Sequence, residues 1–123
     1  MTIGPGMTSS PNPSAEMVQK NNNDHVLPLT GEIDLHVSPR ISASLGAMID
    51  AKPKQVVVDL TNVSYIDSSG LAVLIEGMQN VEAYGGKFAL AGLQANVRPI
   101  FEIARLDQVF RIFPDVPAAL AAA

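Results

Sequence analysis

The sequence predicts a single α/β domain in which helices cover a small sheet. Apolar runs typical of buried strands, the β-branched 54–60 and the run 87–93, alternate with segments whose apolar residues recur at helical spacing. The connections between these segments are short, and 123 residues suffice for one hydrophobic core but not for two. Such alternation is typical of parallel strands joined by helices that pack on the sheet.

The beginning of the chain differs in composition from the rest. Residues 1–14 are rich in Gly, Pro, Ser, Thr and Asn, so we expect a disordered lead-in before a domain over 15–123. Apolar segments at 15–20 and 25–30 flank an Asn-rich run, which predicts a hairpin. Pro28 cannot donate a ladder hydrogen bond, so its strand is expected to carry a bulge or to lie at an edge.

A first helix is predicted to begin with Ser38 as its N-cap and Pro39 in its first turn, and to end before Pro53. Its apolar residues share one face: Ile41, Leu45, Met48 and Ile49. The run 54–60 follows without polar alternation, which indicates an interior strand covered on both faces.

A second helix is expected from about Ser69 to Ala83, ended by the glycine pair at 85–86. Its inward stripe is predicted to comprise Leu71, Leu74, Ile75, Met78 and Val81 or Glu82.

The remainder of the chain predicts a strand, a helix, a short strand and a last helix. The third helix, within 96–106, should face inward with Val97, Ile100, Phe101 and Ala104. A strand is expected within 108–113. Asp115 should cap the terminal helix, with Pro117 in its first turn.

The composition excludes several classes of function. The formal charge is −4 and the few Lys and Arg residues do not cluster, so no nucleic-acid partner is expected. The chain has no cysteine, which rules out disulfides and thiolate metal sites and suits the cytosol. No apolar run approaches the roughly 20 residues of a membrane span, and the N-terminus lacks the pattern of a signal peptide. We therefore expect a cytoplasmic protein with no membrane partner.

The tetrapeptide Asp67-Ser68-Ser69-Gly70 lies where a predicted strand ends and a predicted helix begins, a usual place for a site in an α/β sheet. Asp67 or Ser68 could simply cap the helix. Alternatively, one serine could accept a phosphoryl group, which the free N–H groups of a helix N-terminus accommodate.

A nucleophilic serine is the third interpretation, and the sequence favours it least. The residue two positions before either serine is not the glycine of a nucleophile elbow. His25 and His36 are the only histidines that could act as the base, and both lie far upstream in sequence. Their spacing from Asp24 and Asp34 forms no metal-ligand motif, so no metal site is predicted.

Three stretches together resemble one known family. VVVDLTNVSYIDSSGLAVL resembles the signature of STAS-domain anti-sigma factor antagonists, and LTGEIDLHVSPRI resembles their conserved loop and first helix. GGKFALAGLQANVRPIFEIARLDQVFRIFPD resembles the strand, helix and strand that follow. The likeness runs from about residue 15 to 119. It implies a STAS-like (SpoIIAA-like) single domain with a small mixed β-sheet and helices packed on it.

The resemblance also implies a bacterial partner-switching regulator that is not an enzyme and needs no cofactor. Such antagonists bind an anti-sigma factor, itself a serine kinase of the histidine-kinase-like ATPase fold, so that the sigma factor is released. The kinase phosphorylates the first serine, here Ser68, and the antagonist dissociates until a serine phosphatase restores it. The residues that the resemblance assigns to the partner-binding surface are Asp34, Asp67, Ser69, Gly70 and Leu71.

An alternative within the same fold remains open. A STAS module of a stressosome-like scaffold, or an accessory subunit of a lipid transporter, would bind partners through the same face without being phosphorylated.

Overall fold

The computed structural model describes residues 18–21 and 24–122, so the expected lead-in at 1–14 lies outside the described part. The described part contains a five-stranded sheet in the order β1-β2-β3-β4-β5. The strands are β1 (Val18–Asn21), β2 (Asp24–Ile33), β3 (Gln55–Ile66), β4 (Lys87–Ala91) and β5 (Arg111–Phe113). The helices are α1 (Ser38–Asp50), α2 (Ser68–Ala83), α3 (Arg98–Ile103) and α4 (Val116–Ala121), with a 3-10 turn at Leu106–Gln108.

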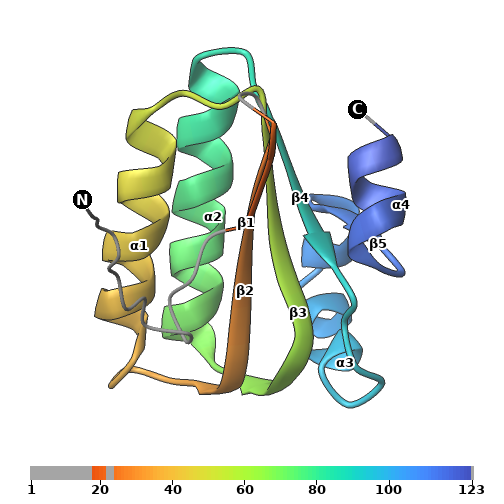
Figure 1. Ribbon diagram of the computed structural model, residues 1–123. Coiled ribbons are helices and arrows are strands. Elements are labelled where there is room, and N and C mark those ends of the chain that lie inside the picture. Colours follow the sequence, from red (N-terminus) through yellow and green to blue (C-terminus); the bar gives the residue numbers. More distant parts are fainter. Residues whose placement is uncertain (1–17, 22–23, 123) are drawn as a thin grey trace, which may run out of the picture.

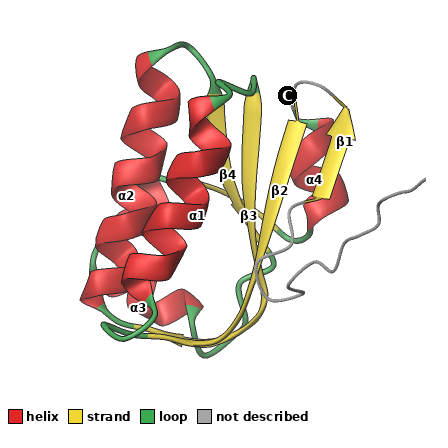
Figure 2. Cartoon of the chain, turned by 60° about the vertical axis from the view of Figure 1, so that its left-hand side comes forward, coloured by secondary structure: helices red, strands yellow, loops and turns green. Residues whose placement is uncertain are grey.

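The strands β2, β3, β4 and β5 are parallel, and β1 pairs antiparallel with β2. The sheet is therefore mixed, as predicted, and the expected hairpin is confirmed. Helices α1 and α2 lie together on one face of the sheet, whereas α4 lies on the other (Figures 1 and 2). The predicted α/β class with helices packed on the sheet is confirmed.

Most of the core lies between the sheet and the α1–α2 layer. On α1, Leu45, Met48 and Ile49 are buried as expected. On α2, Val81 is buried and Glu82 is exposed, which decides between the two candidates for that position. A smaller cluster lies under α4 and consists of Val26, Val57, Ala89, Ala91 and Ala119. These buried aliphatic surfaces drive folding, at about 25 cal/mol per Å² removed from water.

The interior strand β3 has partners on both sides, which explains the unbroken run Val56–Val58, all of it buried. The strand continues beyond the apolar run 54–60, because residues up to Ile66 still pair with β2, and it ends directly before Asp67 as predicted. The bulge expected at Pro28 is confirmed, since the β2–β3 register shifts between Pro28 and Thr30.

The chain after β4 departs from the prediction. The third helix ends at Ile103, and Ala104, expected to face inward, is exposed. Arg105 follows with a left-handed φ of 62°, which interrupts the helix before the 3-10 turn. At the last helix, Asp115 accepts a hydrogen bond from Ala118 N at 2.8 Å, which confirms the predicted cap.

Candidate functional site

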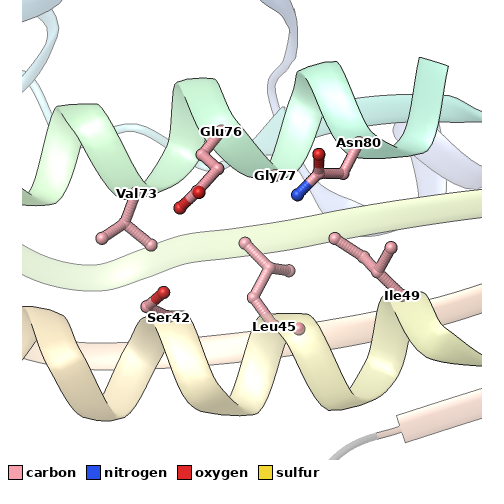
Figure 3. A pocket seen from close by; sticks show the side chains of 8 residues that line it. Ser42, Leu45, Ile49, Val73, Glu76, Gly77 and Asn80 are labelled. Carbon is pink, nitrogen blue, oxygen red and sulfur yellow. The ribbon is translucent and has the colours of Figure 1, made fainter. Parts of the chain in front are cut away.

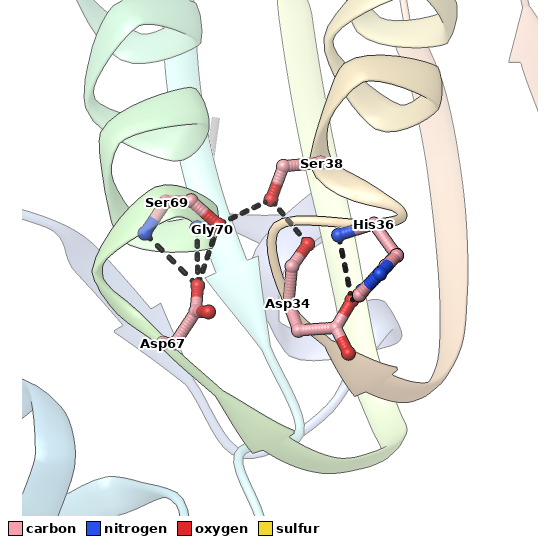
Figure 4. Close-up of polar contacts among 6 residues, drawn as sticks. All are labelled: Asp34, His36, Ser38, Asp67, Ser69 and Gly70. Carbon is pink, nitrogen blue, oxygen red and sulfur yellow. Dashed lines mark hydrogen bonds and ion pairs between the residues drawn. The ribbon is translucent and has the colours of Figure 1, made fainter.

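The site lies at the edge of the sheet where β2 and β3 end. These parallel strands pair up to Ile33 and Ile66, so the residues that follow, Asp34 and Asp67, begin neighbouring loops. The Asp67 backbone N–H donates to the Ile33 carbonyl at 3.0 Å and extends the strand pairing by one bond. The start of α1 and the start of α2 are thereby held side by side (Figure 4).

Asp67 is the N-cap of α2. Its backbone is extended, and its Oδ1 accepts hydrogen bonds from Ser69 N at 2.9 Å and Gly70 N at 3.2 Å. Two backbone donors that the helix cannot satisfy internally are thus paired. The capping interpretation is confirmed for Asp67, while Ser68 is the first residue of the helix.

The hydroxyl of Ser69 is held from two directions. It donates to Asp67 Oδ1 at 2.6 Å, and its Oγ lies 2.8 Å from Ser38 Oγ (Figure 4). Ser38 Oγ in turn donates to the Asp34 carbonyl at 2.8 Å. We call Ser38 and Ser69 the hydroxyl pair.

The role predicted for Ser38 is therefore wrong. The N-cap position of α1 is Val37, which makes no capping bond through its side chain, and Ser38 is the first helical residue. Ser38 is only 4% exposed because its side chain points toward α2. A serine followed by a proline is compatible both with the N-cap and with the first helical position. Only the contact with α2 distinguishes these two positions for Ser38.

The neighbouring Ser68 differs from Ser69. Ser68 is exposed, whereas Ser69 is half-buried. Among the described residues, no side-chain hydrogen bond is formed by Ser68. Two adjacent serines thus present one free hydroxyl and one that is engaged.

The electrostatics at the start of α2 favour negative charge. The pKa of Asp67 is lowered chiefly by the hydrogen bond from the Ser69 hydroxyl, while partial removal from solvent acts in the opposite direction. The N–H bonds from Gly70 and Ser69 lower this pKa further. Asp67 therefore remains ionised at neutral pH, beside the partial positive charge of the helix N-terminus.

The turn between β2 and α1 presents Asp34 and an apolar side chain. Asp34 Oδ1 accepts from the His36 backbone N–H at 2.9 Å, while the His36 imidazole is exposed with Nδ1 3.9 Å from the same oxygen. Leu35 is 70% exposed, and Tyr65, near the end of β3, is 47% exposed. The loop edge thus carries carboxylates and accessible apolar groups.

Gly70, expected on the contact surface, is buried. A Cβ at this position would lie 2.7 Å from both Ile33 Cγ2 and Ile66 Cγ1. The glycine therefore allows α2 to pack closely on the ends of β2 and β3, which corrects the expectation that it lies open to a partner. Leu71 is half-buried and packs against the core.

A groove of about 190 Å³ runs between α1 and α2 and is lined in part by Val73, Glu76 and Asn80 (Figure 3). Its floor includes Gly77, where a Cβ would meet Leu45 Cδ2. Near the start of α2, Ala72 is exposed and Val73 is half-buried.

The geometry gives the nucleophile interpretation no support. In residues 24–122, no hydrogen bond joins Ser68 or Ser69 to a histidine, because the partners of Ser69 are a carboxylate and a second hydroxyl. His25 lies on β2 beside Val56, at the start of the β2–β3 pairing. No group of three His, Cys, Asp or Glu residues that could hold a metal ion occurs in the described part.

No helix within the described residues has both the length and the apolar character that crossing a bilayer requires.

Comparison with known proteins identifies the family. Residues 15–119 match the STAS domain family. The anti-sigma-B factor antagonist of Bacillus subtilis is 30% identical over 95 residues, which are 77% of this chain and 86% of that protein. The anti-sigma-F factor antagonist RsfB of Mycobacterium tuberculosis is 28% identical over 112 residues, 91% of each chain. The chain belongs to the STAS domain family and, within it, to the anti-sigma factor antagonists.

Solved structures agree on the fold. An anti-sigma factor antagonist from Mycobacterium paratuberculosis superposes with a TM-score of 0.78 at 25% identity, over 87% of this chain and 92% of that one. The phosphorylated form of SpoIIAA, a Bacillus cell fate determinant, superposes with a TM-score of 0.69 at 21% identity, over 87% of this chain and 96% of that one. The SpoIIAA-like fold expected from the sequence is confirmed.

Proposed function

We propose that this protein acts in the cytoplasm by binding an anti-sigma factor that is also a serine kinase of the histidine-kinase-like ATPase fold, so that a sigma factor is released. Phosphorylation of Ser68 ends the binding, and a serine phosphatase restores it. The proposal rests on one observation above all: Ser68 is exposed on the first turn of α2, while the adjacent Ser69 is hydrogen-bonded.

Ser68 has the access that a phosphoryl acceptor requires. In the transfer, Ser68 Oγ attacks the γ-phosphorus of ATP bound to the kinase, and the bond from that phosphorus to the leaving ADP breaks. The hydroxyl proton passes to a base of the kinase or to water. The product carries about −1.5 to −2 charges at neutral pH.

The fold tolerates this charge because of where Ser68 lies. Negative charge near a helix N-terminus is stabilised by the helix dipole and by free N–H groups. Ser68 is exposed, and the buried residues at this end of α2 begin with Gly70. The added charge therefore alters the surface and leaves the packing in place.

The surface around Ser68 suits a protein partner. Leu35 and Tyr65 provide apolar contact area, and Asp34 and Asp67 provide carboxylates beside the acceptor. A phosphate added among these carboxylates repels any acidic group of the partner and must be desolvated if the interface is to re-form. Leu71 contributes at the edge of this surface, whereas Gly70 contributes through internal packing only.

The relatives support the proposed partner class. The antagonists of Bacillus subtilis and Mycobacterium tuberculosis are named for anti-sigma-B and anti-sigma-F factors, respectively. SpoIIAA, which shares the fold, has been solved in a phosphorylated form. The assignment of the acceptor to Ser68 in this chain depends on the exposure of that residue.

Binding of the cognate anti-sigma factor to wild type, Ser68→Ala and Ser68→Asp, measured by titration calorimetry, tests the proposal. We expect wild type and Ser68→Ala to bind equally well and Ser68→Asp to bind at least about a hundredfold more weakly. Gln79→Glu is the matched control, because it adds one negative charge to an exposed position farther along α2 and should bind as wild type does. Equal affinity of Ser68→Asp and wild type would contradict the switch.

A further inference from the structure

We propose that Ser38, on α1, is a positioning residue that directs phosphorylation to Ser68 by keeping Ser69 inaccessible. This inference rests on the proposed function, because it concerns which of two adjacent hydroxyls the kinase modifies. The two serines have the same chemistry and follow one another in the chain, so their surroundings must distinguish them.

The surroundings of Ser69 Oγ leave it little freedom to react. Its hydrogen is donated to Asp67 Oδ1, and the opposite side of the oxygen faces Ser38 Oγ at 2.8 Å. Attack on phosphorus requires that a lone pair of the oxygen point at the phosphoryl group and that the transferred oxygens find room. At Ser69 the space on the far side from Asp67 is occupied by Ser38.

Ser38 itself has little freedom to move away. It is 4% exposed, and its hydroxyl is bonded to the Asp34 carbonyl, which also accepts the Ser38 backbone N–H at 2.9 Å. Pro39 follows directly and restricts the backbone at the start of α1. A phosphoryl group on Ser69 would have to displace this turn and would place its charge against the Asp67 carboxylate.

Removal of the Ser38 hydroxyl should open one side of Ser69. In Ser38→Ala, Ser69 keeps its bond to Asp67 but loses the oxygen that lies 2.8 Å from its own. Ser69 then becomes a second acceptor. Within the described residues, Ser68 forms no hydrogen bond to Ser38 or Ser69 through its side chain. Ser68 should therefore be phosphorylated at the same rate in Ser38→Ala as in wild type.

Phosphorylation of the purified full chain by ATP and the cognate anti-sigma factor kinase tests this, with the modified serine located by tandem mass spectrometry. Wild type should carry phosphate on Ser68 alone. Ser68→Ala should react slowly, and Ser68→Ala combined with Ser38→Ala should gain phosphate on Ser69 about two- to fivefold faster, the factor that corresponds to the lower part of the range for one neutral hydrogen bond. Ser42→Ala is the control, because Ser42 lies one turn along α1 and lines the groove toward α2.

The outcomes separate the inference from the proposed function. If wild type is phosphorylated on Ser68, and the double variant gains no phosphate on Ser69 relative to Ser68→Ala, the role of Ser38 is overturned and the switch stands. If Ser42→Ala opens Ser69 as well as Ser38→Ala does, a specific role for Ser38 is likewise overturned. If neither serine of wild type accepts phosphate, both the inference and the proposed function are overturned.

Discussion

Ser38 Oγ and Ser69 Oγ lie 2.8 Å apart, although 31 residues separate them in the chain. Their contact joins the first turn of α1 to the first turn of α2 (Figure 4). The loops that follow β2 and β3 therefore form one site, in which one serine is engaged and its neighbour Ser68 is free.

The hydroxyl pair should contribute modestly to stability. Three oxygen–oxygen contacts run from the Asp34 carbonyl through Ser38 Oγ and Ser69 Oγ to the Asp67 carboxylate. Only two hydroxyl hydrogens, those of Ser38 and Ser69, are available for these three contacts. We therefore expect a coupling free energy of about 0.5–1 kcal/mol between Ser38→Ala and Ser69→Ala, the lower part of the range for a neutral hydrogen bond. Urea unfolding of both single variants and the double variant measures this coupling. The pair Ser42→Ala and Ser69→Ala should show additive effects.

Asp67 should make the protein sensitive to acid. Its folded-state pKa lies below the ordinary value of 3.8, chiefly because the Ser69 hydroxyl donates to it. Ionised Asp67 therefore stabilises the fold at pH values above its unfolded-state pKa, and this contribution is lost as the pH falls through the folded-state pKa. In Ser69→Ala the pKa of Asp67 should rise toward its ordinary value, as followed by NMR of the side-chain carboxyl carbon. An unchanged pKa would show that the backbone donors alone determine it.

Loss of the Asp67 cap should destabilise α2. We expect Asp67→Ala to lower the free energy of unfolding by about 0.5–2 kcal/mol at neutral pH, because Ser69 N and Gly70 N lose their acceptor. Asp50→Ala, which removes an exposed carboxylate at the C-terminal end of α1, is the control and should not destabilise. Equal losses in the two variants, measured by urea unfolding, would contradict the capping role.

The glycines of the two long helices should respond in opposite ways to alanine. Gly70→Ala places a Cβ 2.7 Å from side chains of Ile33 and Ile66, and we expect it to lower the free energy of unfolding by about 1–3 kcal/mol. At Gly46, on α1, an added Cβ would have no atom within 4 Å, so Gly46→Ala should raise the free energy of unfolding by up to about 1 kcal/mol. Thermal and urea unfolding of both variants provide the comparison. A stable Gly70→Ala protein would mean that α2 can shift away from the strands without cost.

The exposed Leu35 should matter for binding and not for folding. Leu35→Ala is expected to weaken binding of the cognate anti-sigma factor by more than about 1 kcal/mol, roughly fivefold, because a large exposed apolar group in the turn between β2 and α1 is lost. Its stability should change by less than about 0.5 kcal/mol, since Leu35 is 70% exposed. Ile103→Ala is the control, because Ile103 is 85% exposed on α3. Helix α3 follows β4, and β4 and β2 lie on opposite sides of β3 in the sheet. Calorimetric titration should show wild-type affinity for Ile103→Ala.

Predictions from the sequence succeeded where the physical cause is local. The apolar spacing of α1, the buried valines of β3 and the cap formed by Asp115 all depend on residues within a few positions of one another. They failed where a distant segment decides. Ser38, predicted to cap α1, instead contacts Ser69 on α2 through its hydroxyl, and no pattern in the sequence around Ser38 indicates that contact.

The amino-acid sequence alone determined the order of strands and helices, the aliphatic core and the position of the two serines at a strand-to-helix junction, because periodicity and capping act over short stretches of chain. The burial of Gly70, the side chain that Ser38 contacts and the difference between Ser68 and Ser69 were decided only by the tertiary structure. These features depend on the parallel pairing of β2 with β3 up to Ile33 and Ile66, which brings together two loops that are distant in sequence.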